Sequence, residues 1–270
     1  MINWRKYNGA LIPTTPPHIE ADFLGIEEEI KNQNAYFSRW TSNFDQNEET
    51  QFWYVICDEK LEILDYSKNT RNQIRRGLRN CEVRIIDKEI ILKEGYGSYN
   101  AAFLRYNTYL DPKSEEEFYQ EIESLGKEWE FWGIYYNEKM IGYSQNKIIG
   151  DYCDYSTIKF NPDYLRYYPS YALFFTMNQY YLNEKGLRYV NDGARSISHE
   201  TNIQSFLIQK FKFRKAYCTL NIIYSTKVKF ILFIIYPFKS IISLLKFAPF
   251  VKMNILICQE KIRRSYEKRN

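Results

Sequence analysis

The sequence predicts an α/β fold of the α+β kind, in which helices flank a mixed, mostly antiparallel sheet. Residues 152–213 alternate strand, helix, strand and helix, a run that favours parallel strands joined by a crossover helix. Ahead of this run, residues 130–136 and 140–149 predict a β-hairpin around Asn137-Glu138-Lys139. The chain has 270 residues, of which 45% are hydrophobic and 18% aromatic. This composition excludes a disordered chain and predicts a sizeable core.

Turn and capping residues bound the elements of the alternating run. The first strand, Tyr152–Phe160, stops at Asn161-Pro162 because proline cannot extend a ladder. A helix starts near Pro169-Ser170, and the short strand Leu187–Asn191 is followed by a turn at Asp192-Gly193. Ligands of α/β sheets bind at strand ends and helix N-termini, so the loops that follow the two strands are the first candidates for a site.

The other elements follow from shorter patterns. Residues 1–60 predict a short acidic helix around Glu27–Glu29 and two aromatic strands, which make this segment the N-terminal part of the sheet. Further along, the patterns predict a strand, two helices and a last alternating strand, at residues 82–86, 99–109, 115–125 and 216–224.

A basic helix is predicted over residues 66–80. If Ser67 caps this helix, its polar residues share one face, and no carboxylate lies between Lys68 and Asn80. Guanidinium groups suit diphosphates and nucleic-acid backbones, which makes the face a candidate phosphate-binding surface. A solvated helix face is the alternative. The residues concerned are Lys68, Arg71, Asn72, Arg75 and Arg79.

The C-terminal segment differs in charge from the rest. The whole chain has a net charge of +4, and residues 225–270 carry +8, which leaves −4 for residues 1–224. The run Phe230–Phe238 is uncharged but too short to span a bilayer, which needs about 20 residues. Residues 227–258 are therefore predicted to be a basic amphipathic helical tail on an anionic membrane surface. A helical hairpin that packs on the domain or forms a homodimer is the alternative.

Composition also bears on compartment and domain division. The five cysteines are scattered and lie mostly in apolar runs, which is typical of reduced thiols in a cytosolic protein. The N-terminus lacks the apolar core of a signal peptide, so we expect a cytoplasmic protein, peripheral on the inner face of the membrane. The predicted division is an N-terminal part of the sheet, a transferase-like core and the tail, at residues 1–60, 61–226 and 227–270.

Several short motifs, in this order, resemble the GNAT acyltransferase superfamily. The match is closest to its FemABX-like branch of peptidoglycan bridge-forming aminoacyltransferases and covers about residues 66–215. The motifs are Ser67–Arg76, Phe160-Asn161-Pro162, Tyr168-Pro169-Ser170, Asp192-Gly193, and Asn202 with Phe206-Leu207 ahead of Lys210–Phe213. The resemblance implies a GNAT-like sheet and an acyl or aminoacyl transferase. The Gly-rich turn that cradles the acetyl-CoA pyrophosphate in ordinary GNAT enzymes is replaced here by Tyr167–Ala172.

Positions in the predicted loops and helix starts, together with the resemblance for Asp192 and Asn202, indicate candidate roles for individual residues. Asp192 and His199 are the candidates for deprotonating an acceptor, although an Asp-Gly turn and a helix cap are the plain alternatives. Arg195 would join the basic helix in holding an anionic substrate group. The donor would contact residues around two predicted helix starts, where capping is again the alternative: Tyr168, Ser170, Tyr171 and Asn202.

Two hypotheses of function follow. The first is a GNAT-fold enzyme that transfers an acyl or aminoacyl group to an amine or hydroxyl of a cell-envelope precursor, which is an amino-sugar, nucleotide-linked or lipid-linked compound. Its donor would be acyl-CoA or aminoacyl-tRNA, with acetyl-CoA disfavoured, and it would need no bound cofactor or metal. The second is a non-catalytic, membrane-peripheral module that binds a phosphorylated glycan or lipid through the basic helix. tRNA, the phosphate-bearing precursor and a second copy of the chain are the expected partners.

Overall fold

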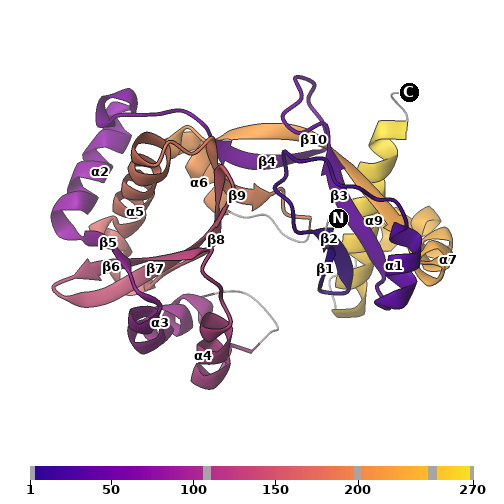
Figure 1. Cartoon of the computed structure of the whole chain (residues 1–270), viewed down its shortest axis with the longest axis horizontal. Helices are drawn as coiled ribbons and strands as arrows, with labels where there is room; N and C mark the ends of the chain where they lie inside the picture. The colour runs from indigo at the N-terminus through magenta and orange to yellow at the C-terminus, as the bar shows by residue number, and fades with distance from the viewer. Residues whose placement is uncertain (1–3, 106–110, 198–201, 243–247, 268–270) are drawn as a thin grey trace. The chain divides into compact units, whose positions relative to one another are not determined.

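The computed structural model describes residues 4–105, 111–197, 202–242 and 248–267. By their internal contacts the residues group into two units, which we describe separately. The first unit comprises Met1–Val55, Ala194–Asn202 and Lys215–Asn270, and the second comprises Ile56–Gly193 and Ile203–Arg214. The described strands form the mixed, mostly antiparallel α/β architecture that the sequence predicts (Figure 1).

The first unit contains the strands in the order β1-β2-β3-β10-β4, together with helices α1, α7, α8 and α9. β1 and β2 form a hairpin around Asn8-Gly9, where both residues have positive φ. β2 is parallel to β3, and β3 is antiparallel to β10. The bounds are β1 Trp4–Tyr7, β2 Ala10–Pro13, α1 Ile26–Asn32, β3 Phe37–Ser42, β4 Phe52–Cys57, β10 Arg214–Tyr224, α7 Thr226–Ile235, α8 Lys239–Ile242 and α9 Ala248–Glu267.

The core of the first unit lies between β10 and the C-terminal helices. The inward residues of β10 alternate along the strand, as expected of a half-buried strand, and they pack against Val228 and Leu232 of α7 and Ile262 of α9. Tyr266 of α9 donates its hydroxyl proton to the carbonyl oxygen of Cys218, over 3.1 Å. One side of α7 and the inner side of α9 therefore belong to this core.

The second unit contains strands in the order β9-β8-β7-β6-β5, and the last two residues of β4 are counted with it. β5 to β8 are antiparallel neighbours, whereas β9 is parallel to β8. In Figure 1, α2 and α5 lie on one face of this sheet, and α3 and α4 lie on the other. The bounds are α2 Lys68–Asn80, β5 Glu82–Ile86, α3 Lys88–Phe103, α4 Glu115–Glu123, β6 Trp129–Tyr136, β7 Lys139–Ile149, β8 Tyr152–Phe160, α5 Pro169–Asn178, β9 Tyr189–Ala194 and α6 Asn202–Phe211.

Most of the predicted elements are present, and two differ. β8 and β9 are parallel neighbours with α5 between them in sequence, which confirms the predicted crossover. The helix predicted at residues 99–109 is α3, which begins earlier, at Lys88, and ends at Phe103; residues 106–109 of the prediction lie outside the described residues. The early start was missed because the buried positions of α3 include Gly95 and Ser98, which break its apolar pattern. The predicted turn at Asp192-Gly193 is wrong: both residues continue β9. Gly193 has a φ of +93°, and its N–H donates to Oδ1 of Asn191 over 3.0 Å, so the strand bends without ending.

Helices α2 and α5 approach each other closely at Gly77. A Cβ atom at this position would lie 2.6 Å from the carbonyl oxygen of Tyr168 and 3.0 Å from the backbone nitrogen of Ala172. Glycine is therefore required here for packing, since the obstructing atoms are backbone and cannot rotate away. This contact fixes the start of α5 against the basic helix.

We expect Gly77→Ala to lower the free energy of unfolding by about 1–3 kcal/mol, the usual cost of overpacking. Gly97 provides the matched control, because it lies exposed in α3 and an added Cβ there would meet no atom within 4 Å. Gly97→Ala should instead raise stability by up to about 1 kcal/mol through helix propensity. Urea unfolding of both variants measures the difference. Equal effects at the two positions would show that the α2–α5 contact is loose.

Candidate functional site

The second unit has a fork in its sheet where β8 and β9 part. Their parallel pairing runs over three residue pairs, from Tyr152 with Tyr189 to Asp154 with Asn191. Beyond these pairs β8 continues to Phe160 and β9 continues to Ala194, and both strands lie wholly within the described residues. Backbone groups on the inner edges of such a fork are available to an inserted ligand.

Asp192 lies at the point where the fork opens. Its carboxyl group has a pKa raised to about 7, first because of burial and second because the carboxylate of Asp154 is nearby. A hydrogen bond from Gln204 of α6 acts in the opposite direction and lowers the pKa. Asp154 is itself positioned by Asn191, whose Nδ2 donates to Oδ1 of Asp154 over 2.8 Å. A carboxyl group that titrates near neutral pH is suited to accepting a proton from a substrate.

The start of α5 forms the second part of the site. Tyr168 has a φ of +63° and turns the chain into the helix, and the guanidinium carbon of Arg76 lies 4.5 Å from the centre of its ring. Ser170 follows in the first turn of α5 and is half-buried. The first N–H groups of a helix and a nearby cation favour an anionic group.

Tyr171 lies in the core at the start of α5, and its contact with a donor stays a prediction. Its side chain is 8% exposed, and its ring packs against Phe206 and Phe211 of α6, with centroid distances of 5.1 and 5.7 Å. α6 thus connects the two parts of the site, since Gln204 bonds to Asp192 while Phe206 packs on the start of α5. Tyr171 supports the site from the core.

The basic face of α2 is present, but one of its residues, Arg71, bonds within the protein. Ser67 caps the helix as predicted, accepting from the N–H of Thr70 over 3.3 Å, and Lys68, Arg75 and Arg79 are exposed. Arg71 is only half-exposed, and its Nη1 donates to the carbonyl oxygens of Leu64 and Tyr66, over 2.9 and 3.1 Å. Arg71 therefore holds the chain entering α2, a role that the helical wheel does not reveal.

The remaining predicted residues lie outside the fork. Arg195 belongs to the first unit, where its Nη1 donates to the carbonyl oxygen of Gln51 and its guanidinium carbon lies 4.8 Å from the ring of Trp53. Asn202 is an exposed residue at the start of α6. His199 lies outside the described residues. The assignments of all these residues to donor, acceptor or proton transfer stay predictions.

Sequence reasoning missed several residues of the site. Asp154 and Asn191 each follow a pair of aromatic or apolar residues at the start of a strand, and this contrast is a signal that could have found them. Gln204 and Arg76 carry no such signal, because each lies in an ordinary helical pattern. Their positions depend on tertiary contacts of α6 and α2.

Within the described ranges, two further features bear on function. No group of three or more His, Cys, Asp or Glu side chains is arranged to hold a metal ion. In the same part of the chain, the helices are too short or too polar for any of them to cross a bilayer.

Comparison with known proteins finds solved structures with a similar fold. No protein-family model matches the sequence, and no curated protein sequence matches it. Among solved structures, FemX is similar with a TM-score of 0.60 and 10% identity, over 85% of each chain. The C-terminal domain of a putative lysylphosphatidylglycerol synthetase from Agrobacterium fabrum is similar with a TM-score of 0.57 and 12% identity, over 86% of this chain and 83% of that one. The chain thus shares its fold with FemX and with this synthetase domain, as the predicted resemblance to the FemABX-like branch implies for the fold.

Proposed function

We propose that this protein is a transferase that moves an acyl or aminoacyl group to an amine or hydroxyl of a cell-envelope precursor. The observation that carries the proposal is Asp192, a partly buried carboxyl group at the opening of the β8–β9 fork, whose pKa is raised to about 7 by burial and by Asp154. The two solved structures with this fold are named FemX and a domain of a putative lysylphosphatidylglycerol synthetase, and both names support a transferase over a binding module.

The proposed reaction needs one proton acceptor at the fork. The nitrogen or oxygen of the acceptor attacks the carbonyl carbon of the donor, and its proton passes to the carboxylate of Asp192. The bond from the carbonyl carbon to the donor's sulfur or oxygen then breaks, and the leaving thiol or hydroxyl takes up that proton. Near neutral pH a carboxyl group with this pKa is partly ionised, so it can both accept and return the proton.

The start of α5 is the proposed donor side. Tyr168 and Pro169 occupy the turn that is glycine-rich in acetyl-CoA enzymes, and the ring of Tyr168 lies under Arg76. Side chains at this turn keep a pyrophosphate from approaching the backbone as closely as glycine would allow. An aminoacyl-tRNA or a larger acyl carrier is therefore preferred to acetyl-CoA. The exposed basic side chains of α2, next to this turn, suit the phosphates of the donor or of the precursor.

The proposal is tested by supplying a cell-envelope extract with acyl-CoA or aminoacyl-tRNA and measuring released CoA or deacylated tRNA. The rate should rise with pH and level off above about 7, because the carboxylate form of Asp192 is the base. Asp192→Asn should lower the rate about 100-fold or more. Asp154→Asn should shift the rise to lower pH, since it removes the charge that raises the pKa of Asp192.

Asp163→Asn serves as the control, because Asp163 is exposed and pairs only loosely with Arg105, at 3.8 Å. Its rate should equal that of the unmodified protein. Absence of turnover with every donor, together with retained binding of phosphorylated glycans, would favour the non-catalytic module. Full activity in Asp192→Asn would remove Asp192 from the mechanism.

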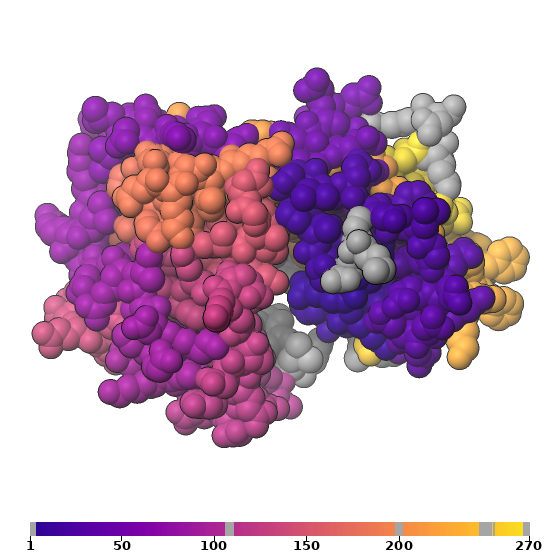
Figure 2. All heavy atoms as spheres, in the orientation of Figure 1, coloured from indigo at the N-terminus to yellow at the C-terminus, as the bar shows by residue number. Residues whose placement is uncertain are grey.

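We further propose that α7 and α8 dock the protein on an anionic membrane surface. The side of α7 that faces away from β10 exposes large apolar side chains, including Phe230 at 66% and Phe233 at 79%, and it continues into Phe238 and Ile241. In Figures 1 and 2 α7 lies at the margin of the first unit. The exposed Lys227 and Lys229 flank this strip, and residues 225–270 carry a net charge of +8. An apolar strip flanked by lysines matches the leaflet's acyl chains and anionic headgroups.

Vesicle sedimentation tests the docking proposal. The full chain should bind vesicles of phosphatidylglycerol and phosphatidylcholine, and added salt should weaken the binding. The double variant Phe230→Ser, Phe233→Ser should bind at least tenfold more weakly. Leu104→Ser is the matched control, because Leu104 is 71% exposed and belongs to the second unit, whereas α7 belongs to the first. Unchanged binding in the double variant, or a dimer that dissociates in it, would contradict docking on a membrane.

A further inference from the structure

A separate pocket lies in the second unit, between its sheet and helices α3 and α4. It has a volume of about 240 Å³. Tyr99 of α3, Phe118 of α4 and Tyr143 of β7 form its inner wall. These three rings pack on one another, with centroid distances of 5.6 Å between Tyr99 and Phe118 and 6.1 Å between Phe118 and Tyr143. In Figure 1 α3 and α4 lie across the sheet from α2 and α5, so this pocket differs from the donor side of the fork.

The floor of the pocket is a patch of four side chains on two neighbouring strands. Gln145 of β7 lies opposite Thr157 of β8, and Tyr143 lies opposite Lys159 in the same ladder. Residues two apart on a strand share one face, so the four side chains project together. The register shifts directly after Gln145, and such a bulge is a common device for aiming side chains at a site.

Gln145 is the informative residue of this floor. Gln145 is 4% exposed, and it lines the pocket. Its amide atoms are not among the buried side-chain atoms that lack a partner, so they are open to the pocket and available to a ligand. The amide offers donors and an acceptor side by side, and Thr157 next to it offers a hydroxyl. These groups are suited to a ligand that both donates and accepts hydrogen bonds.

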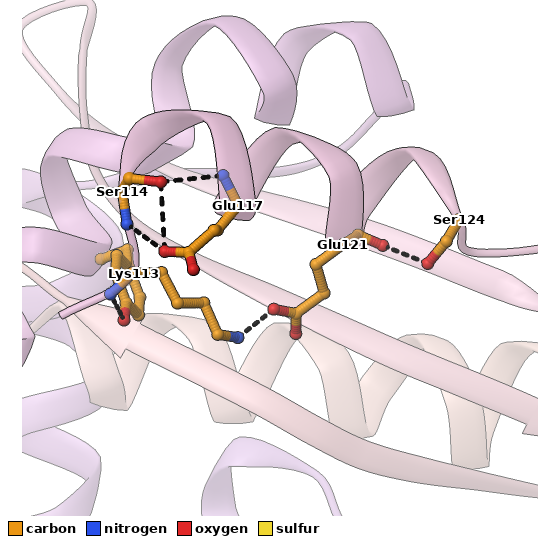
Figure 3. Close-up of polar contacts among 6 residues, drawn as sticks. Lys113, Ser114, Glu117, Glu121 and Ser124 are labelled. Carbon is orange, nitrogen blue, oxygen red and sulfur yellow. Dashed lines mark hydrogen bonds and ion pairs between the residues drawn. The ribbon is translucent and has the colours of Figure 1, made fainter. Parts of the chain in front are cut away.

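A pair of opposite charges lies at the mouth of the pocket. Lys113 is ion-paired with Glu121 of α4 (Figure 3). Lys113 directly precedes Ser114, the residue that caps this helix. The backbone N–H of Lys113 donates to the hydroxyl oxygen of Tyr99 over 2.8 Å. Ser114 and Glu117 close a capping box directly after it, which holds this end of α4 in place. The mouth is therefore ordered, polar and close to neutral in charge.

We propose that this pocket binds a single sugar ring. Hydroxyl groups of a sugar both donate and accept hydrogen bonds, as the amide of Gln145, the hydroxyl of Thr157 and the Lys113–Glu121 pair require. The pocket is smaller than the roughly 300–1,000 Å³ typical of sites for drug-sized ligands, which limits the ligand to about one ring.

Other ligand classes fit the pocket less well. A nucleobase needs an exposed aromatic face on which to stack, whereas Tyr99, Phe118 and Tyr143 are only 1–6% exposed. A bare cation would meet Lys159 on the floor, and a bare anion would leave the neutral amide of Gln145 poorly matched and would compete with Glu121 for Lys113. A sugar held here would belong to the acceptor, so this inference rests on the proposed function for its biological meaning, but binding can be measured without any transfer.

Saturation-transfer NMR and calorimetry on the full chain test the proposal, with N-acetylglucosamine and methyl β-D-glucopyranoside as probes. We expect saturable binding of at least one probe. Gln145→Leu should weaken it about tenfold or more, because it removes the amide that faces the pocket, while the thermal midpoint stays nearly unchanged. Gln120→Leu is the matched control, since Gln120 lies exposed on α4 outside the pocket, and it should bind as the unmodified protein does.

Several outcomes would overturn the assignment. These are the absence of saturable sugar binding, equal binding by Gln145→Leu, or displacement of the probes by adenosine, free lysine or inorganic phosphate at lower concentration. A loss of thermal stability in Gln145→Leu with unchanged binding would show a structural role. Sugar binding without any transfer would leave the pocket assigned while removing the proposed function, and transfer without sugar binding would do the reverse.

Discussion

The short parallel pairing of β8 with β9 is the constraint on which the site depends. Three residue pairs join the strands, and a strand that bends at Gly193 then leaves its neighbour. The bend needs a positive φ and the hydrogen bond from Gly193 to Asn191. Because Asn191 also bonds to Asp154, one side chain both shapes the fork and positions the carboxylate that raises the pKa of Asp192. Backbone geometry and electrostatics are thus set by the same residues.

The surroundings of the fork are rigid on the side of α5. Gly77 lets α2 approach the backbone at Tyr168, and α6 packs Phe206 on Tyr171. Beneath α5, the hydroxyl of Tyr181 accepts hydrogen bonds from Trp132 and Asn146, over 2.9 and 3.2 Å, and donates to Glu130 over 2.9 Å. A buried polar network in which the central group is fully paired favours one arrangement of the helix on the sheet. A preorganised site of this kind is suited to chemistry that relies on positioning.

Local patterns predicted the alternating run, the crossover between β8 and β9, and the cap at Ser67, because these depend on nearby residues. These patterns gave no correct prediction where contacts in the folded chain determine the position or the partner of a residue. The Asp-Gly pair commonly forms a turn, but here the side chain of Asn191 accepts a hydrogen bond from the N–H of Gly193, and the pair stays in β9. Arg71 fits a basic surface on a helical wheel, yet it bonds to carbonyl groups of the preceding chain. Gln145 has no distinctive sequence context, and only its burial beside Tyr143 and Thr157 marks it as unusual.

The central claim is that the fork holds a carboxyl group tuned to neutral pH. Titration of the side-chain ¹³C signal of Asp192 by NMR, assigned by comparison with Asp192→Asn, measures this property directly. Our account predicts a midpoint near pH 7, because burial and the neighbouring Asp154 both disfavour the charged form. A midpoint near 4, the value of an exposed aspartate, would contradict it.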